Sequence, residues 1–227
     1  ITWDGGPAGT GTDWSDPVNW VGDVLPGAGD DALINAFAGP AIQLNNVVTV
    51  RSVSSAKSLT IAGSLTVSDA SLFTAPVLLS GTLAGTGDCT FTSVLTWTGG
   101  VMAGPATTGA PVGRVIINSA GTLAISGTTH DLNRTIENNG STLWTAGPIR
   151  MAGGMFNNNS QFTASSAGSL QSFGSASANT FNNLGTFTKL GSGETAFSIL
   201  AAGVAFNSLG TIVLQEGMLT LAGGVVL

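Results

Sequence analysis

The sequence is poor in charged residues and in the side chains that most often carry out chemistry. Only 8% of its 227 residues are Asp, Glu, Lys or Arg, whereas an ordinary globular domain has about 25%. It contains one Cys, one His and no Tyr. One cysteine excludes a disulfide within the chain, and one His with one Cys excludes the usual Cys and His sets of structural zinc sites.

Basic residues are especially scarce. Six Lys and Arg stand against 12 Asp and Glu, so the formal net charge is −6. A nucleic-acid groove needs clustered cations, and anionic membrane surfaces attract basic patches. We therefore expect neither of these as a partner. Half of the acidic residues lie at the start of the chain, at positions 4, 13, 16, 23, 30 and 31.

Long hydrophobic runs are also missing, so we expect no membrane insertion. Residues 199–206 form the richest apolar stretch and are too few to cross a bilayer. The apolar content of 43% is nevertheless too high for a disordered chain. The 33 glycines, together with many Ser, Thr and Asn, are typical of short strands joined by tight corners.

A phrase that begins with Ile or Phe and continues with asparagine occurs four times. The copies are residues 136–140, 156–160, 181–185 and 206–210, and their first residues lie 20, 25 and 25 positions apart. A repeat at this period is typical of a solenoid, in which each coil buries its apolar face only against its neighbours.

Apolar and polar residues alternate after each phrase. In the last copy Ile212 and Leu214 would face one side of the chain, and Val213 and Gln215 the other. A period of two indicates strands rather than helices. We therefore predict an all-β fold, a parallel β-helix (β-solenoid) of about eight coils with roughly 20 to 25 residues in each.

Equivalent residues of successive coils lie above one another in a parallel solenoid, so the phrase predicts two columns of side chains. They are an inward aromatic column of Phe156, Phe181 and Phe206 and an amide ladder of Asn157, Asn182 and Asn207. A second echo, between residues 95–104 and 143–153, places Trp97 and Trp144 about two coils apart. We expect both to be buried, although an exposed indole could also stack on a sugar.

The first 40 residues differ from the rest, because they hold three of the five Trp residues and half of the acids. A solenoid needs an atypical terminal unit, since its first coil otherwise exposes an unpaired strand edge and an open core. We expect residues 1–40 to form an N-terminal capping and assembly segment in which Trp3, Trp14 and Trp20 close the core. Residues 41–227 would form the β-helix.

The last residues keep the strand pattern and contain no charge and no Pro. Leu219, Leu221, Val225 and Leu227 would therefore form an open edge with an apolar core beneath it. We expect either a continuation into a longer solenoid or self-association, in which this edge meets the N-terminal segment of the next copy and builds a fibre. The start at Ile1 instead of Met suggests a processed or excised form.

Several motifs resemble those of a known group of proteins. They are residues 14–20 (WSDPVNW), 25–31 (LPGAGDD), 95–100 (LTWTGG), 132–138 (LNRTIEN) and 181–189 (FNNLGTFTK). These motifs resemble the repeat regions of secreted, adhesin-like parallel β-helix proteins of bacterial surfaces, and the resemblance covers nearly the whole chain. It implies a right-handed β-helix, a secreted or cell-surface location, and a structural role as adhesin stalk or filament subunit.

The main alternative is a β-helix that binds or cleaves carbohydrate, for example a surface polysaccharide. Its best catalytic candidates are His130, Asp131, Arg134 and Glu137, because a carboxylate beside Arg can transfer protons. The same residues could instead form a hydrogen-bonded corner. A sugar-cleaving groove normally spreads charges over adjacent coils, and residues 151–227 contain only three. The sequence therefore favours a protein that is not an enzyme.

No cofactor is expected, with one exception. Asp30 and Asp31 follow a Gly-rich turn and could supply hard oxygen ligands to calcium, although such turns also use Asp for backbone hydrogen bonds. Cys89 has no catalytic signature around it, so we expect it to be a small buried residue.

Overall fold

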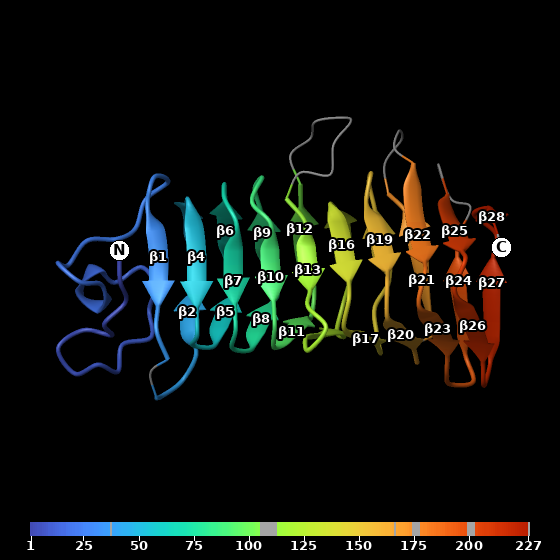
Figure 1. Cartoon of the computed structure of the whole chain (residues 1–227), viewed down its shortest axis with the longest axis horizontal. Helices are drawn as coiled ribbons and strands as arrows, with labels where there is room; N and C mark the ends of the chain where they lie inside the picture. Colours follow the sequence, from blue (N-terminus) through green and yellow to red (C-terminus); the bar gives the residue numbers. More distant parts are fainter. Residues whose placement is uncertain (37, 105–112, 166, 174–177, 199–202, 227) are drawn as a thin grey trace.

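The chain forms an elongated rod of short stacked strands, with its termini at opposite ends (Figure 1). The computed structural model describes residues 1–36, 38–104, 113–165, 167–173, 178–198 and 203–226. Apart from one short 3-10 helix, η1 (Pro17–Asn19), the regular structure of these residues consists of strands. None of the described helical structure is long and apolar enough to span a membrane.

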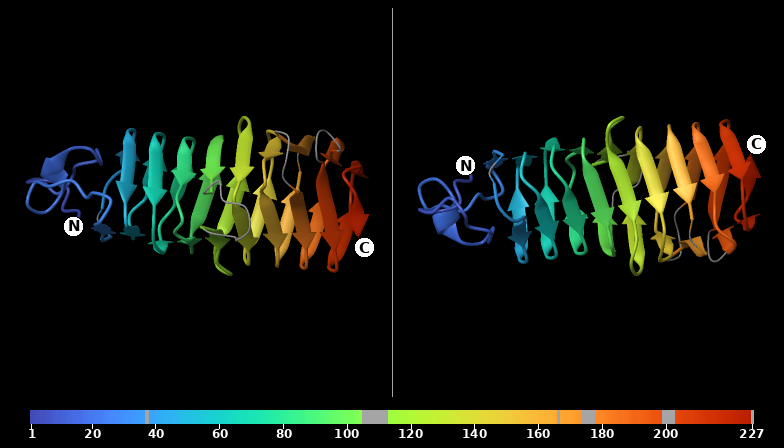
Figure 2. Two further views of the ribbon diagram at one scale, coloured as in Figure 1. Left: turned by 90° about the horizontal axis from the view of Figure 1, so that it is seen from above. Right: turned by 90° about the horizontal axis from the view of Figure 1, so that it is seen from below.

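The strands form three parallel sheets that run along the rod (Figure 2). Sheet I contains β1 (Asp31–Ile34), β4 (Ser52–Ser55), β7 (Ser71–Phe73), β10 (Cys89–Phe91), β13 (Val115–Ile117), β16 (Thr135–Asn138), β19 (Met155–Asn158), β22 (Asn179–Asn183), β25 (Val204–Ser208) and β28 (Val225–Val226). Sheet II contains β2 (Ile42–Leu44), β5 (Leu59–Ile61), β8 (Val77–Leu79), β11 (Val94–Trp97), β14 (Thr122–Ile125), β17 (Ser141–Trp144), β20 (Gln161–Ala164), β23 (Thr186–Lys189) and β26 (Thr211–Leu214). Sheet III contains β3 (Val47–Val50), β6 (Ser64–Val67), β9 (Thr82–Ala84), β12 (Gly100–Ala103), β15 (His130–Asn133), β18 (Ile149–Met151), β21 (Gly168–Ser172), β24 (Glu194–Phe197) and β27 (Met218–Leu221).

Each coil contributes one strand to each sheet, always in the order I, II, III. The fold prediction is confirmed, because the structure is an all-β parallel solenoid of about 8 turns. Residues paired across neighbouring coils are separated by as few as 17 positions, as for Ile42 and Leu59, and by as many as 30, as for Gly100 and His130. β1 already pairs with β4, so sheet I begins inside the segment expected to act as a cap.

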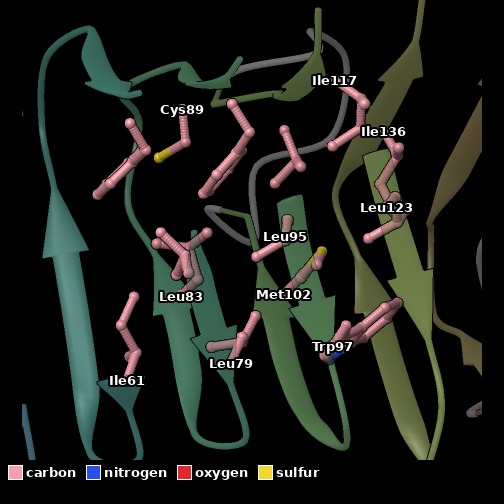
Figure 3. Close-up of a cluster of buried hydrophobic side chains, with 14 of the residues drawn as sticks. Ile61, Leu79, Leu83, Cys89, Leu95, Trp97, Met102, Ile117, Leu123 and Ile136 are labelled. Carbon is pink, nitrogen blue, oxygen red and sulfur yellow. The ribbon is translucent and has the colours of Figure 1, made fainter. Parts of the chain in front are cut away.

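The interior is filled by the inward residues of all three sheets (Figure 3). In β11, for example, Leu95 and Trp97 are buried, whereas Thr96 between them lies on the outer side. Trp97 pairs with Ile125, which pairs with Trp144 one coil further on, and both Trp residues are buried. The expected relation between the two Trp residues is therefore confirmed.

Aromatic rings fill the C-terminal half of the core. Phe156 and Phe181 stack with their centroids 5.1 Å apart and Phe181 and Phe206 at 5.4 Å, so the three rings form one column inside sheet I. A parallel stack of Phe162 and Phe187, with centroids 5.3 Å apart, lies inside sheet II and meets the column edge to face. Such offset and edge-to-face pairs stabilise beyond their buried area by about 0.5–1.5 kcal/mol each.

Glycine ends three of the four copies of the phrase, and Ser160 ends the other, at the corner between sheets I and II where successive coils approach closely. A Cβ atom on Gly185 would lie 2.0 Å from the carbonyl oxygen of Ser160, and one on Gly210 would lie 2.1 Å from that of Gly185. A side chain at Gly185 or Gly210 would therefore push two coils apart.

The N-terminal segment covers the end of the core. Trp20 contacts Trp3 and Trp14 edge to face, each at 4.9 Å between centroids, and its indole N–H donates to the Trp14 carbonyl over 2.8 Å. All three Trp residues are buried. The segment also extends the sheets, since Thr2 bridges to Leu33 of β1 and Asp13 bridges to Gln43 of β2.

Removing one ring from the column should destabilise the rod. We expect Phe181→Ala to lower the free energy of unfolding by about 4 kcal/mol, because a fully buried ring leaves a cavity between two neighbours. Urea denaturation followed by circular dichroism would measure the loss. The control Leu184→Ala removes a side chain that is 58% exposed, three positions further on, and should change stability by less than about 0.5 kcal/mol. Equal effects of the two changes would contradict the role of the column.

Candidate functional site

A ladder of polar side chains runs along the outer face of sheet I. Asn207 donates from Nδ2 to Oδ1 of Asn182 over 2.9 Å, and Asn182 donates in the same way to Asn157 over 2.8 Å. Asn157 in turn donates to Oε1 of Glu137 over 2.8 Å. The three asparagines thus form one hydrogen-bonded row, and a carboxylate accepts the last bond.

A second ladder, which the sequence interpretation missed, lies inside the same sheet. Asn138 donates to Asn158 over 2.8 Å, Asn158 to Asn183 over 2.7 Å, and Asn183 to the hydroxyl of Ser208 over 2.9 Å. The three asparagines are fully buried. Each also donates its other N–H to a backbone carbonyl in sheet II, at Gln161, Thr186 and Thr211 respectively. The buried ladder therefore fastens sheet I to sheet II at every corner it passes.

His130 points into the core. Its ring is buried and meets Trp97 edge to face at 4.8 Å between centroids. Nε2 lies 3.1 Å from the Trp97 carbonyl oxygen and 3.0 Å from that of Ser126, and Nδ1 lies 3.3 Å from that of Pro148. The imidazole thus lies against three backbone segments and presents no nitrogen to the surface.

The other three catalytic candidates lie in separate places. Asp131 is on the outer face of sheet III and forms a two-bond ion pair with Arg150, with N–O distances of 2.6 and 2.7 Å. Arg134 is buried at the next corner, and Glu137 belongs to the outer ladder of sheet I. The structure does not bring the four candidates to one solvent-accessible point.

Arg134 supports the corner from within. Its Nε donates to the Gly113 carbonyl, and Nη2 donates to that of Gly87 over 3.1 Å. Burial lowers the pKa of this guanidinium below its usual range. Burial also raises the pKa of the nearby Cys89 thiol to about 11, so this cysteine is a poor nucleophile in the folded protein.

A hollow of about 420 Å³ lies outside this corner, where sheet III turns into sheet I. Its charged lining consists of Asp69, Asp88, Arg114 and Glu137. Arg114 pairs with Asp88 at 2.6 Å between Nη2 and Oδ2. Burial alone would raise the pKa of Asp88, but hydrogen bonds from the side chain and backbone of Arg114 outweigh it and hold this pKa below 3.8.

A second hollow, of about 630 Å³, lies over the outer face of sheet III. Gly168, Ser169 and Ala196 form part of its floor, and Gln171 and Glu194 are among its polar lining. Sequence reasoning identified neither hollow, because both depend on which residues of different coils become neighbours at a corner or on a sheet.

The proposed calcium ligands take part in hydrogen bonds within the chain. Asp30 accepts from the Gly27 N–H over 2.8 Å. Asp31 pairs with Arg51 and accepts from Ser52, and these bonds hold the pKa of Asp31 well below its usual range. The described part of the chain has no group of three or more His, Cys, Asp or Glu suited to a metal ion. Calcium binding stays a prediction.

The last coil leaves apolar side chains at the end of the rod. Ile212, Leu219 and Leu221 pack on the core but are only partly covered. Val225 and Val226, in β28, are 48% and 62% exposed. Leu227, the fourth residue of the expected assembly edge, lies outside the described residues.

Comparison with models of protein families, with curated proteins and with solved structures finds no match. The structure supports the parallel β-solenoid part of the resemblance. The adhesin-like identity stays a prediction, because no comparison supports it.

The two ladders should differ in their contribution to stability. We expect Asn158→Ala to lower the free energy of unfolding by about 2–3 kcal/mol, since it leaves buried partners unsatisfied. Asn182→Ala makes the same chemical change in the partly exposed outer ladder, where water can replace the lost bonds, and should cost less than about 1 kcal/mol. Urea denaturation of both variants is the measurement, and the reverse order would contradict this assignment.

The ion pair of Asp88 should make stability depend on pH. Its pKa is lowered in the folded state, so its contribution is present above the ordinary value of 3.8 and is lost as the pH falls through the folded-state value. Asp88→Asn should therefore flatten the acid side of the stability profile, measured as the urea midpoint against pH. The control Thr86→Ala, in the lining of the same hollow, removes no ionisable group and should keep the wild-type slope. An unchanged slope in Asp88→Asn would contradict the prediction.

Proposed function

We propose that this chain is a structural segment of an extracellular β-solenoid, a stalk or filament subunit, whose C-terminal coil is completed by further β-structure. The observation that carries this proposal is the difference between the two ends of the rod. One end is covered by a folded segment, and the other ends in strand edges (Figure 1). Side chains that pack on the core at that second end are only partly covered.

The N-terminal segment occupies the outward edges of two of the three first strands, β1 and β2, and leaves β3 of sheet III with β6 as its one strand partner in the described residues. The Trp3 N–H donates to the Leu33 carbonyl, and the Leu33 N–H donates to that of Ile1. Trp14 and Gln43 are joined by a similar bond over 3.0 Å. The N-terminal edges of β1 and β2 are thus already occupied.

The open end has the properties of a pairing surface. β26 and β27 are the last strands of sheets II and III in the described residues, and their outward edges face no further strand. Such an edge is a template for another strand, and the apolar side chains beside it gain from burial. The added strand can come from the same polypeptide or from a second copy.

A head-to-tail stack remains our hypothesis for fibre formation, but the covered end restricts its form. The open coil would contact the outer surface of the cap, because direct strand pairing with β1 and β2 requires displacement of residues 1–14. Two open ends can instead meet around a two-fold axis, which gives a closed dimer and no fibre.

A structural role is favoured over a catalytic one by where the charged residues lie. His130 and Arg134 are buried as supports of the backbone, and Asp131 is neutralised by Arg150. The extracellular location rests on the resemblance of the sequence motifs to those of secreted adhesin-like β-helix proteins.

The proposal is tested by measuring self-association of the purified chain. We expect concentration-dependent association in sedimentation velocity, fibres or dimers in negative-stain electron microscopy, and binding of the dye ANS to the open coil. The double change Leu219→Lys and Leu221→Lys should abolish association, because it places two charges on the open core.

A matched control is Leu143→Lys, which places one charge on the outer face of sheet II at a side chain that is 42% exposed. This variant should associate like the wild type, and circular dichroism would establish that all variants are folded. A chain that stays monomeric at every concentration and binds no ANS would contradict the proposal, since its end would then be closed.

A further inference from the structure

One aromatic ring differs from the other described aromatic residues. The remaining described Trp and Phe side chains are buried in the core, whereas Phe173, just after β21, is 51% exposed. It lies on the outer side of the rod, where a large apolar ring gains nothing from the core. Its exposure therefore requires another explanation.

The exposed ring is held in place by a charged group. Arg150 lies with Cζ 4.3 Å from the centroid of the Phe173 ring. The same guanidinium makes two parallel bonds to Asp131, through Nε to Oδ1 and Nη2 to Oδ2. A planar guanidinium fixed at both sides is a rigid support, so the orientation of the ring is set before any ligand arrives.

Polar groups continue from this pair into the hollow over sheet III. Gln171 is paired in register with Arg150 on the neighbouring strand, and it lines the hollow of about 630 Å³. The small residues Gly168, Ser169 and Ala196 also line the hollow. Glu194 adds a carboxylate, which also accepts from Thr220 over 2.5 Å.

We propose that Phe173, Arg150, Asp131, Gln171 and the hollow beside them form a binding site for an uncharged oligosaccharide. An aromatic face receives the C–H side of a sugar ring, while a few fixed polar groups receive its hydroxyls and set its orientation. The lining of the hollow comes from three successive coils, from Gly147 and Pro148 just before β18 to Glu194 and Ala196 of β24, which suits several linked sugar units better than a single one.

The charges at the site favour an uncharged saccharide over an acidic one. The positive charge of Arg150 is balanced by Asp131, and Glu194 leaves one negative charge at the site. An acidic polysaccharide would be repelled, because no unpaired cation among these residues can offset its carboxylates. The site lies on the side of the rod, so it operates whether or not the open coil is occupied.

The test is titration calorimetry of the whole chain with pentasaccharides of glucose (β-1,4 and α-1,4), of mannose and of N-acetylglucosamine, and with tetragalacturonate as the acidic probe. We expect saturable binding of at least one uncharged probe and none of tetragalacturonate. Phe173→Ala should weaken that binding about tenfold or more. Arg150→Lys keeps the charge but loses the two-bond pair, and should also weaken it.

Leu143→Ala is the control, since it removes an exposed aliphatic side chain from sheet II and should bind like the wild type. Sedimentation velocity on the same samples separates this site from self-association at the open coil. The proposal is overturned if no uncharged probe binds at its solubility limit, if the acidic probe binds more tightly, or if Phe173→Ala binds as well as Leu143→Ala.

Discussion

Parallel pairing between successive coils is the constraint on which the rest of this structure depends. The backbone hydrogen bonds hold each residue beside its counterpart in the next coil, so side chains are forced into columns. Such columns are favourable for aromatic rings, which stack, and for amide side chains, which both donate and accept hydrogen bonds. Like charges in one column repel each other. Two ion pairs between neighbouring coils follow this rule, Arg114 with Asp88 and Arg150 with Asp131.

The two amide ladders show how the same residue type serves two purposes. The outer ladder donates toward the N-terminal end and finishes on Glu137, whereas the buried ladder donates toward the C-terminal end and finishes on Ser208. The bond dipoles of the two rows therefore oppose each other across one sheet. The asparagines of the buried row also donate to backbone carbonyls of sheet II at the corner.

Much of the fold could be predicted from the sequence because the phrase recurs once per coil, so its spacing gives the length of each coil. The buried ladder was predictable too: with Phe156 inward and Asn157 outward, a period of two places Asn158 inward. The positions of His130 and Arg134 were not, because they depend on corner lengths that differ from coil to coil. One residue separates β15 from β16, and Arg134 turns into the core there.

Those corner lengths have a practical consequence. Between sheets III and I the connection ranges from one residue, at Arg134, to residues 104–114 between β12 and β13. The strands on both sides of the longest connection nevertheless keep their register with the coils before and after them. The number of residues at this corner therefore does not alter the register of strand pairing in the rod. A foreign peptide inserted there would be displayed at a chosen height along a rigid scaffold, with the sheets beneath it unchanged.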